Sequence, residues 1–300
     1  MRINRRITMD KLIRAVDKNG SIRIFGAITT ELTEKARKIH GLTPVSAAAF
    51  GRCMAANLMM AMDLKTEEET VSLQFKGDGP LGLIVTVAGS NGCVRGYVGD
   101  NTVDIPLKEN GKLDVGGAVG QGYLTVIRDM KMKSPQVGRT ELVSGEIAED
   151  LANYFAVSEQ IPSVVALGVL IDRDYSVKAA GGYIIQLMPG ASEEEISKLE
   201  ENIRKIDTVT NLITAGYDIE DIIKKACDGF GIEITAQSVP QYKCNCSEER
   251  IEKALISLGK GELEDILHNE GSTSLTCYFC NKKYDFPKEK LEKLIEDISK

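Results

Sequence analysis

The spacing of hydrophobic and polar positions along the chain predicts both strands and helices. In several segments apolar and polar residues alternate, which is the period of a β-strand, and turns such as Gly77-Asp78-Gly79-Pro80 separate them. The residues expected to form strands are 21–28, 71–75, 83–87, 93–98, 122–128, 136–143, 164–170 and 178–187. The residues expected to form helices are 7–18, 30–40, 44–63, 144–157, 192–206, 208–214, 218–228 and a C-terminal stretch after Pro287.

The helix expected at 44–63 differs from the others because it is apolar on nearly every face. Thr43 is a suitable N-cap for it, and Pro44 suits the first helical position. A helix that is hydrophobic all round belongs inside a protein. We therefore expect it in a hydrophobic core.

The composition changes after Met188-Pro189-Gly190, where charged helices replace the strands. The apolar positions of these helices form stripes, so the helices must pack against another part of the chain. We expect an α+β fold in three parts: a mixed sheet-and-helix core domain over 1–190, a helical linker over 191–239, and a small C-terminal domain over 240–300 with four cysteines. Residues 229–243 are expected to be a connector.

Composition and charge argue against several functions. The formal net charge is −7 at pH 7, whereas binding to nucleic acid or to an anionic membrane needs a basic surface. No secretory signal is expected, because no uninterrupted apolar run follows the basic start, and no window reaches the roughly 18 apolar residues of a membrane span. We expect a cytoplasmic protein whose cysteines stay reduced.

Four of the seven cysteines form two close pairs near the C-terminus, Cys244-x-Cys246 and Cys277-x-x-Cys280. Each pair supplies two thiolates, and the chain between them folds back to complete a tetrahedral metal site. We expect one Zn²⁺ per chain, because four soft thiolates in a tetrahedron suit this ion. A four-iron cluster is disfavoured, since the tight Cys-x-x-Cys-x-x-Cys run is missing.

The residues leave two interpretations of such a zinc site open. In the first, the ion only holds a small domain together; about 60 residues are marginal by burial alone, so removing the ion would unfold residues 240–300. In the second, the thiolates are also a reversible redox switch, because oxidation of either close pair gives a strained and easily reduced local disulfide. If the linker helices pack on this domain, they would loosen with it.

The remaining cysteines and the two histidines are expected to be structural. Cys53 lies inside the apolar helix, and Cys93 and Cys227 lie outside the two pairs; isolated cysteines usually behave as small hydrophobes. His40 is expected at a helix C-terminus, where a cationic imidazole suits the helix dipole. His268 lies between the pairs, but four cysteines already complete a tetrahedron, so an exposed helical position is expected for it.

Short motifs along the chain carry a resemblance to a known family. Besides Cys244-Asn245-Cys246-Ser247 and Cys277-Tyr278-Phe279-Cys280-Asn281, these motifs are Gly77-Asp78-Gly79-Pro80, Arg95-Gly96-Tyr97, Ser144-Gly145-Glu146-Ile147-Ala148, Ser158-Glu159-Gln160-Ile161-Pro162, Ala180-Gly181-Gly182 and Gln186-Leu187-Met188-Pro189-Gly190. With them, the sequence resembles the heat shock protein 33 family of redox-regulated holdase chaperones over essentially its whole length. It departs from the family's usual Ser-Arg-Glu-Arg at Ser247-Glu248-Glu249-Arg250, where the changed residue is not a ligand.

The resemblance implies an ATP-independent chaperone of the oxidative stress response. The reduced protein would hold zinc through Cys244, Cys246, Cys277 and Cys280 and would be a poor chaperone. Peroxide at raised temperature, or hypochlorite, would form the Cys244–Cys246 and Cys277–Cys280 disulfides and release zinc. The zinc domain and the adjacent linker would then unfold. The exposed apolar surface would bind unfolding client proteins, and the protein would form a homodimer.

Enzymatic functions are the alternative. A zinc hydrolase needs an open metal position, which four cysteines do not leave, so no catalytic residue is assigned. A thiol oxidoreductase with a zinc ribbon needs Cys-x-x-Cys at a helix start after a strand. The aromatic residues between Cys277 and Cys280, and the Asn281-Lys282-Lys283-Tyr284 that follows, are more typical of a zinc knuckle. We therefore expect a protein that is not an enzyme, with the oxidoreductase as the alternative.

Overall fold

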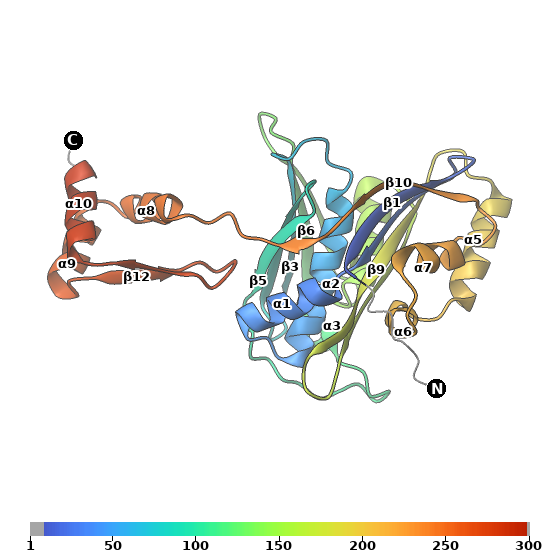
Figure 1. Ribbon diagram of the computed structural model, residues 1–300, viewed down its shortest axis with the longest axis horizontal. Coiled ribbons are helices and arrows are strands. Elements are labelled where there is room, and N and C mark those ends of the chain that lie inside the picture. Colours follow the sequence, from blue (N-terminus) through green and yellow to red (C-terminus); the bar gives the residue numbers. More distant parts are fainter. Residues whose placement is uncertain (1–8, 299–300) are drawn as a thin grey trace. The chain divides into compact units, whose positions relative to one another are not determined.

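The computed structural model describes residues 9–298, and Figure 1 shows their helices and strands. The chain divides into two compact units between Tyr242 and Lys243. The first unit contains two large sheets with helices packed against them, and the second contains a short hairpin with helices. This is the α+β fold that the sequence predicts.

The strands of the first unit form two sheets within residues 9–298. In spatial order, the first sheet consists of β10 (Ile232–Ser238), β1 (Lys11–Asp17), β2 (Ile22–Ile28), β9 (Val177–Leu187) and β8 (Ser163–Ile171), all antiparallel. The second consists of β11 (Gln241–Tyr242), β5 (Cys93–Val98), β4 (Leu83–Gly89), β3 (Thr70–Gly77), β6 (Gly122–Asp129) and β7 (Gln136–Glu141). Its neighbouring strands are antiparallel except for β11, which runs parallel to β5.

Helix α2 (Pro44–Ala61) lies in the core of the first unit, as its apolar sequence predicts. All of its residues except Pro44 and Arg52 are buried, and it contacts both β4 of one sheet and β9 of the other. Thr43 precedes it in an extended conformation, so the chain enters the helix at the predicted cap. The remaining helical segments of this part are α1 (Thr30–His40), α3 (Val115–Val119), α4 (Ala148–Tyr154) and a π-helical turn, η1 (Phe155–Glu159).

Three helices cover the other face of the first sheet: α5 (Glu193–Lys205), α6 (Val209–Thr214) and α7 (Ile219–Ala226). Each begins at a side-chain N-cap, namely Ser192, Thr208 and Asp218. Their apolar stripes form a second core with strand residues such as Ile24 and Ile185. Residues 191–239 therefore belong to the first compact unit, where α5, α6 and α7 pack on the first sheet.

Some elements differ from the prediction. The prediction of a helix at 7–18 is wrong, because residues 11–17 form β1. Residues 7 and 8 lie outside the described part of the chain. Leu12 belongs to the core around α2, and its neighbour Ile13 belongs to the core under α7. Because both faces of this strand are buried, the alternation that marks a half-exposed strand is absent. The connector expected at 229–243 contains β10, which pairs with β1 over 200 residues away in sequence.

Helix α4 begins later than predicted, at Ala148, because a buried carboxylate holds the preceding loop. Oδ1 of Asp150 accepts hydrogen bonds from the amides of Val143, Ser144 and Gly145, and Oδ2 accepts one from the amide of Ile147. These bonds satisfy backbone donors that a helix would otherwise need to pair, and they fix residues 143–147 as a loop.

The second unit has a small core. Its elements are α8 (Glu248–Ile256), α9 (Lys260–Asn269), β12 (Thr273–Thr276), β13 (Lys283–Phe286) and α10 (Lys288–Ile298). Strands β12 and β13 form an antiparallel hairpin, and the buried side chains Leu255, Leu263, Phe286 and Leu291 pack together beside it. A core of this size makes a unit of about 60 residues only marginally stable by burial alone.

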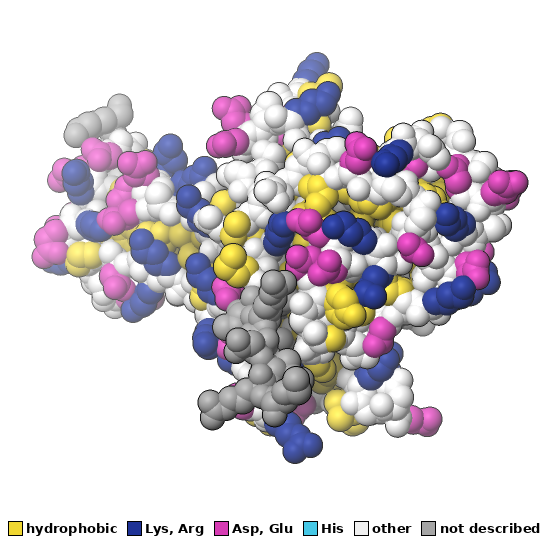
Figure 2. Space-filling view, turned by 45° about the vertical axis from the view of Figure 1, so that its right-hand side comes forward, with side chains coloured by type: hydrophobic (Ala, Val, Ile, Leu, Met, Phe, Trp, Pro, Cys, Tyr) yellow, Lys and Arg dark blue, Asp and Glu magenta, His cyan; other side chains and the backbone are white. Residues whose placement is uncertain are grey.

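Figure 2 shows acidic and basic side chains interspersed over the face in view, without a continuous basic area. Within residues 9–298, no helix combines the length and the apolar character that crossing a bilayer requires.

Candidate metal centre

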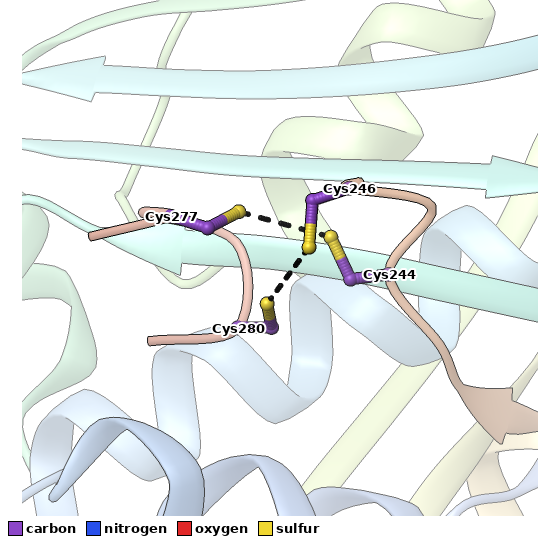
Figure 3. A group of neighbouring side chains, drawn as sticks. All are labelled: Cys244, Cys246, Cys277 and Cys280. Carbon is purple, nitrogen blue, oxygen red and sulfur yellow. Dashed lines mark hydrogen bonds between the residues drawn. The ribbon is translucent and has the colours of Figure 1, made fainter. Parts of the chain in front are cut away.

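The four cysteines of the predicted site lie together in the second unit. The Sγ atoms of Cys244, Cys246, Cys277 and Cys280 are all within 4.8 Å of one another. The first two come from the loop before α8, and the other two from the turn between β12 and β13 (Figure 3). The intervening helices α8 and α9 therefore bring the two pairs together.

Backbone hydrogen bonds shape the turn that carries Cys277 and Cys280. The amide of Cys277 donates to the carbonyl oxygen of Lys282 at 2.9 Å, and the amide of Asn281 donates to the carbonyl of Cys277 at 2.8 Å. Asn281 has a φ of 56°, in the left-handed region that asparagine tolerates better than most residues. This tight reversal holds both side chains on the same side of the hairpin end.

The start of α8 fixes the loop that carries Cys244 and Cys246. Ser247 caps the helix, since its Oγ accepts a hydrogen bond from the amide of Arg250. The guanidinium group of Arg250 donates to the carbonyl of Asn245 at 3.1 Å. The residue between the two cysteines is thus tied to the first turn of the helix.

The spacing of the sulfur atoms fits tetrahedral zinc. With Zn–S bonds of about 2.3 Å, the edge of a tetrahedron of sulfurs is about 3.8 Å. The Sγ atoms of Cys244 and Cys277 are 3.8 Å apart, and those of Cys246 and Cys280 are 3.4 Å apart. All four cysteines are free thiols, so each is available as a ligand. The donor set is therefore suited to a thiophilic ion with closed tetrahedral coordination.

The thiols of Cys244, Cys246 and Cys280 do not ionise alike. Burial raises the pKa of Cys244 and also that of Cys280. Burial opposes ionisation of Cys246 too, but hydrogen bonds from Tyr284 and from the neighbouring thiols outweigh it, so the pKa of Cys246 is lowered to about 7. Among these three thiols, the surroundings of Cys246 favour the negatively charged form most.

Tyr284 is a residue of this site that the sequence analysis did not assign. Its hydroxyl group donates a hydrogen bond to Sγ of Cys246 at 3.1 Å, while its ring is 6% exposed in the small core. The signal for its position lies in β13, where Tyr284 and Phe286 alternate with Lys283 and Asp285. Such alternation places the aromatic side chains on the inner face of the hairpin.

The other cysteines and histidines lie outside the cluster. Cys53 and Cys227 are buried, and burial raises the pKa of both thiols, to about 12 for Cys227. Cys93 is half-buried on β5. His268 is exposed on α9, as expected, and His40 ends α1 but is buried against Tyr242.

A cluster of four cysteines that could hold a metal ion therefore lies on a small unit, which follows a two-sheet α+β unit in the chain. Comparison with known proteins identifies its class: the family model described as "Hsp33 protein" matches residues 10–287. The chain belongs to the Hsp33 family.

Similar proteins cover nearly the whole chain. It is 49% identical over 293 residues to the "33 kDa chaperonin" of Clostridium perfringens, covering 97% of this chain and 92% of that protein. It is 45% identical to the protein of the same name from Clostridium beijerinckii, covering 96% of this chain and 99% of that protein. The crystal structure of the 33 kDa chaperonin from Thermotoga maritima superposes with a TM-score of 0.90 at 36% identity, covering 96% of this chain and 98% of that one.

Membership of this family supports a chaperone function, which implies binding of unfolded client proteins. The four clustered cysteines are compatible with zinc binding.

Proposed function

We propose that this protein is a redox-regulated, ATP-independent holdase chaperone. In its reduced form, Cys244, Cys246, Cys277 and Cys280 hold one Zn²⁺ ion, and the protein is inactive. The observation that carries the proposal is the convergence of four free thiols, from segments more than 30 residues apart, to within 4.8 Å. Reduced thiols of this kind suit the reducing cytoplasm, where we place the protein.

Zinc supplies most of the stability of the second unit in this proposal. The core of that unit gives only marginal stability to about 60 residues by burial alone. Structural zinc contributes on the order of 10–16 kcal/mol, which exceeds the total stability of most domains. Removal of the ion is therefore expected to unfold residues 243–300.

Oxidation is the step that removes the ion. Two thiolates, of Cys244 and Cys246, lose two electrons and form one disulfide, while one molecule of hydrogen peroxide takes up these electrons and leaves as two hydroxide ions. The same reaction joins Cys277 and Cys280. Disulfide sulfurs no longer carry the charge that binds Zn²⁺, so the ion is released.

Unfolding of the second unit then extends into residues 191–239, which we propose act as a releasable linker. Helices α5, α6 and α7 cover an apolar face of the first sheet that includes Ile22, Ile24 and Ile185. Their release exposes this face to unfolding clients, and two activated chains associate as a homodimer. Because binding needs only exposed apolar surface, neither ATP nor a catalytic residue takes part.

The position of Cys277 and Cys280 lends the oxidoreductase alternative little support. Reactive Cys-x-x-Cys motifs lie at a helix N-terminus, where the helix dipole lowers the thiol pKa. Here the motif lies in a turn between two strands, β12 and β13. A test for disulfide reductase turnover at substoichiometric protein distinguishes the two functions.

The test of the proposed function is light scattering by a thermally unfolding client. The zinc-loaded, reduced protein is compared with the peroxide-treated, zinc-free protein, and zinc release and free thiols are counted in parallel. Suppression of aggregation by the oxidised form alone supports the switch. Equal suppression by both forms would leave a constitutive chaperone with a structural metal, and suppression by neither would contradict the proposal.

A further inference from the structure

The hydroxyl group of Tyr284 touches the metal centre at one sulfur. It donates to Sγ of Cys246 at 3.1 Å, and Tyr284 lies on β13 opposite Leu275 of β12. The ring is almost fully buried in the small core, and Nζ of Lys282 lies 4.8 Å from the ring centroid on the same hairpin. The direction of the hydroxyl is therefore set by the packing of the hairpin.

We infer that Tyr284 is a positioning residue of the metal centre, which holds the Cys246 thiolate in place and lowers its nucleophilicity. This inference rests on the proposed zinc site. A thiolate that accepts a hydrogen bond shares its charge with the donor, so less electron density remains for attack on an oxidant. The donor also orients the sulfur, as outer-shell partners of metal ligands generally do.

The arrangement makes the two cysteine pairs unequal. Cys246 belongs to the Cys-x-Cys loop before α8, whereas Tyr284 belongs to the hairpin that also carries Cys277 and Cys280. The hydrogen bond thus joins the two ligand-bearing segments directly, in addition to any bond through the ion. Its loss is expected to weaken metal binding and to expose Cys246 to reagents.

The test compares Tyr284→Phe with the wild-type protein and with Tyr278→Phe. The first change removes only the hydroxyl oxygen and keeps the buried ring. Tyr278 lies in the turn between β12 and β13, and its side chain is 77% exposed, so it is a matched control for loss of a tyrosine hydroxyl. Zinc affinity is measured by competition with a chelator, and alkylation of each cysteine by iodoacetamide is followed by mass spectrometry in the reduced, zinc-loaded full chain.

For Tyr284→Phe we expect zinc affinity about tenfold lower and Cys246 alkylation several-fold faster, with Tyr278→Phe close to wild type. A second readout uses Co²⁺ at saturation: the thiolate-to-metal charge-transfer band should move to lower energy in Tyr284→Phe. A purely structural role for Tyr284 would leave this band in place, even in a less stable variant.

Unchanged affinity, alkylation and band position in Tyr284→Phe would overturn the inference. A wild-type protein that shows no tetrathiolate Co²⁺ spectrum would instead contradict the proposed metal site itself. The two failures are therefore distinguishable.

Discussion

Nε2 of His40 lies 2.7 Å from the hydroxyl oxygen of Tyr242, the last residue of the first unit. The same hydroxyl donates to the carbonyl of Gly96 at 2.9 Å, so its single proton is used there and the imidazole is the donor to the tyrosine. Nζ of Lys35 also donates to the carbonyl of Tyr242. Tyr242 therefore fixes the chain to α1 and β5 immediately before the cysteine-containing unit begins.

This contact is expected to limit how far unfolding spreads from the second unit. In Tyr242→Phe, Nε2 of His40 and the carbonyl of Gly96 lose their hydrogen-bond partner, which lowers the stability of the fold by about 1–3 kcal/mol. We expect faster amide hydrogen exchange over residues 232–242 in the reduced protein, and activation at lower peroxide concentrations. Tyr175→Phe, whose side chain is 62% exposed, is the control. Exchange that matches wild type in Tyr242→Phe would show that the contact does not restrain this segment.

Removal of one thiolate should destabilise the second unit without any oxidant. Cys277→Ser leaves three sulfur ligands, so zinc affinity should fall by orders of magnitude and residues 243–300 should become sensitive to protease under reducing conditions. Zinc content and the cleavage pattern measure this. Cys53→Ala removes a buried thiol of the first unit and should retain zinc and peroxide-dependent activation. Full zinc content with wild-type protease resistance in Cys277→Ser would be incompatible with a four-cysteine site.

Asp10 is expected to make the first unit less stable as the pH rises. Its carboxylate accepts hydrogen bonds from the amides of Glu31 and Leu32 at the start of α1, but burial dominates and raises its pKa from 3.8 to about 6. The folded state therefore binds this proton more tightly than the unfolded chain, and stability falls between about pH 4 and 6.

Asp10→Asn removes this dependence. Between pH 4 and 7, we expect the free energy of unfolding of the wild-type protein to fall relative to that of the variant by an amount on the order of 2 kcal/mol. Urea unfolding of both proteins measures it. The side chain of Arg37 lowers the pKa of Glu34 to about 2, so this group makes the protein more stable as the pH rises towards 4.5. Both proteins contain Glu34, so its effect on the free energy of unfolding cancels in the comparison. Parallel pH profiles for the two proteins would refute the expectation.

The cysteine cluster could be predicted because the two cysteines of each pair are close together in the sequence. Two short motifs supply all four cysteines, and a tetrahedral metal site would combine them in one way. The helix α2 was likewise predictable, since an apolar sequence of that length is stable only when it is buried.

Elements that depend on distant partners could not be predicted in the same way. Strand β1 is covered on both faces, by the core around α2 and by α7, so its sequence has no alternation to reveal it. Strand β10 is mostly exposed and is defined by pairing with β1, for example Ala236 with Arg14. The contacts of Tyr242 and Tyr284 are of the same kind, because a single tyrosine gives no sign of which atom its hydroxyl will reach.

The packing of α7 on the first sheet tests whether the linker helices cover the client-binding surface. Ile222 is fully buried there, and Ile222→Ala should weaken the attachment of the helix by about 2–5 kcal/mol. If release of α5, α6 and α7 exposes the binding face, then the reduced, zinc-loaded variant should already suppress client aggregation in part. Lys224→Ala alters the exposed side of the same helix and should remain inactive until oxidised.

Hydrogen exchange makes the result decisive. Ile222→Ala should show faster exchange in residues 193–226 while zinc stays bound and the amides of α2 stay protected. A variant with this exchange pattern but without any suppression of aggregation would show that clients bind elsewhere. Suppression with zinc still bound would separate the two parts of the proposed switch: the metal centre would act as the sensor, and the linker helices would act as the cover that it controls.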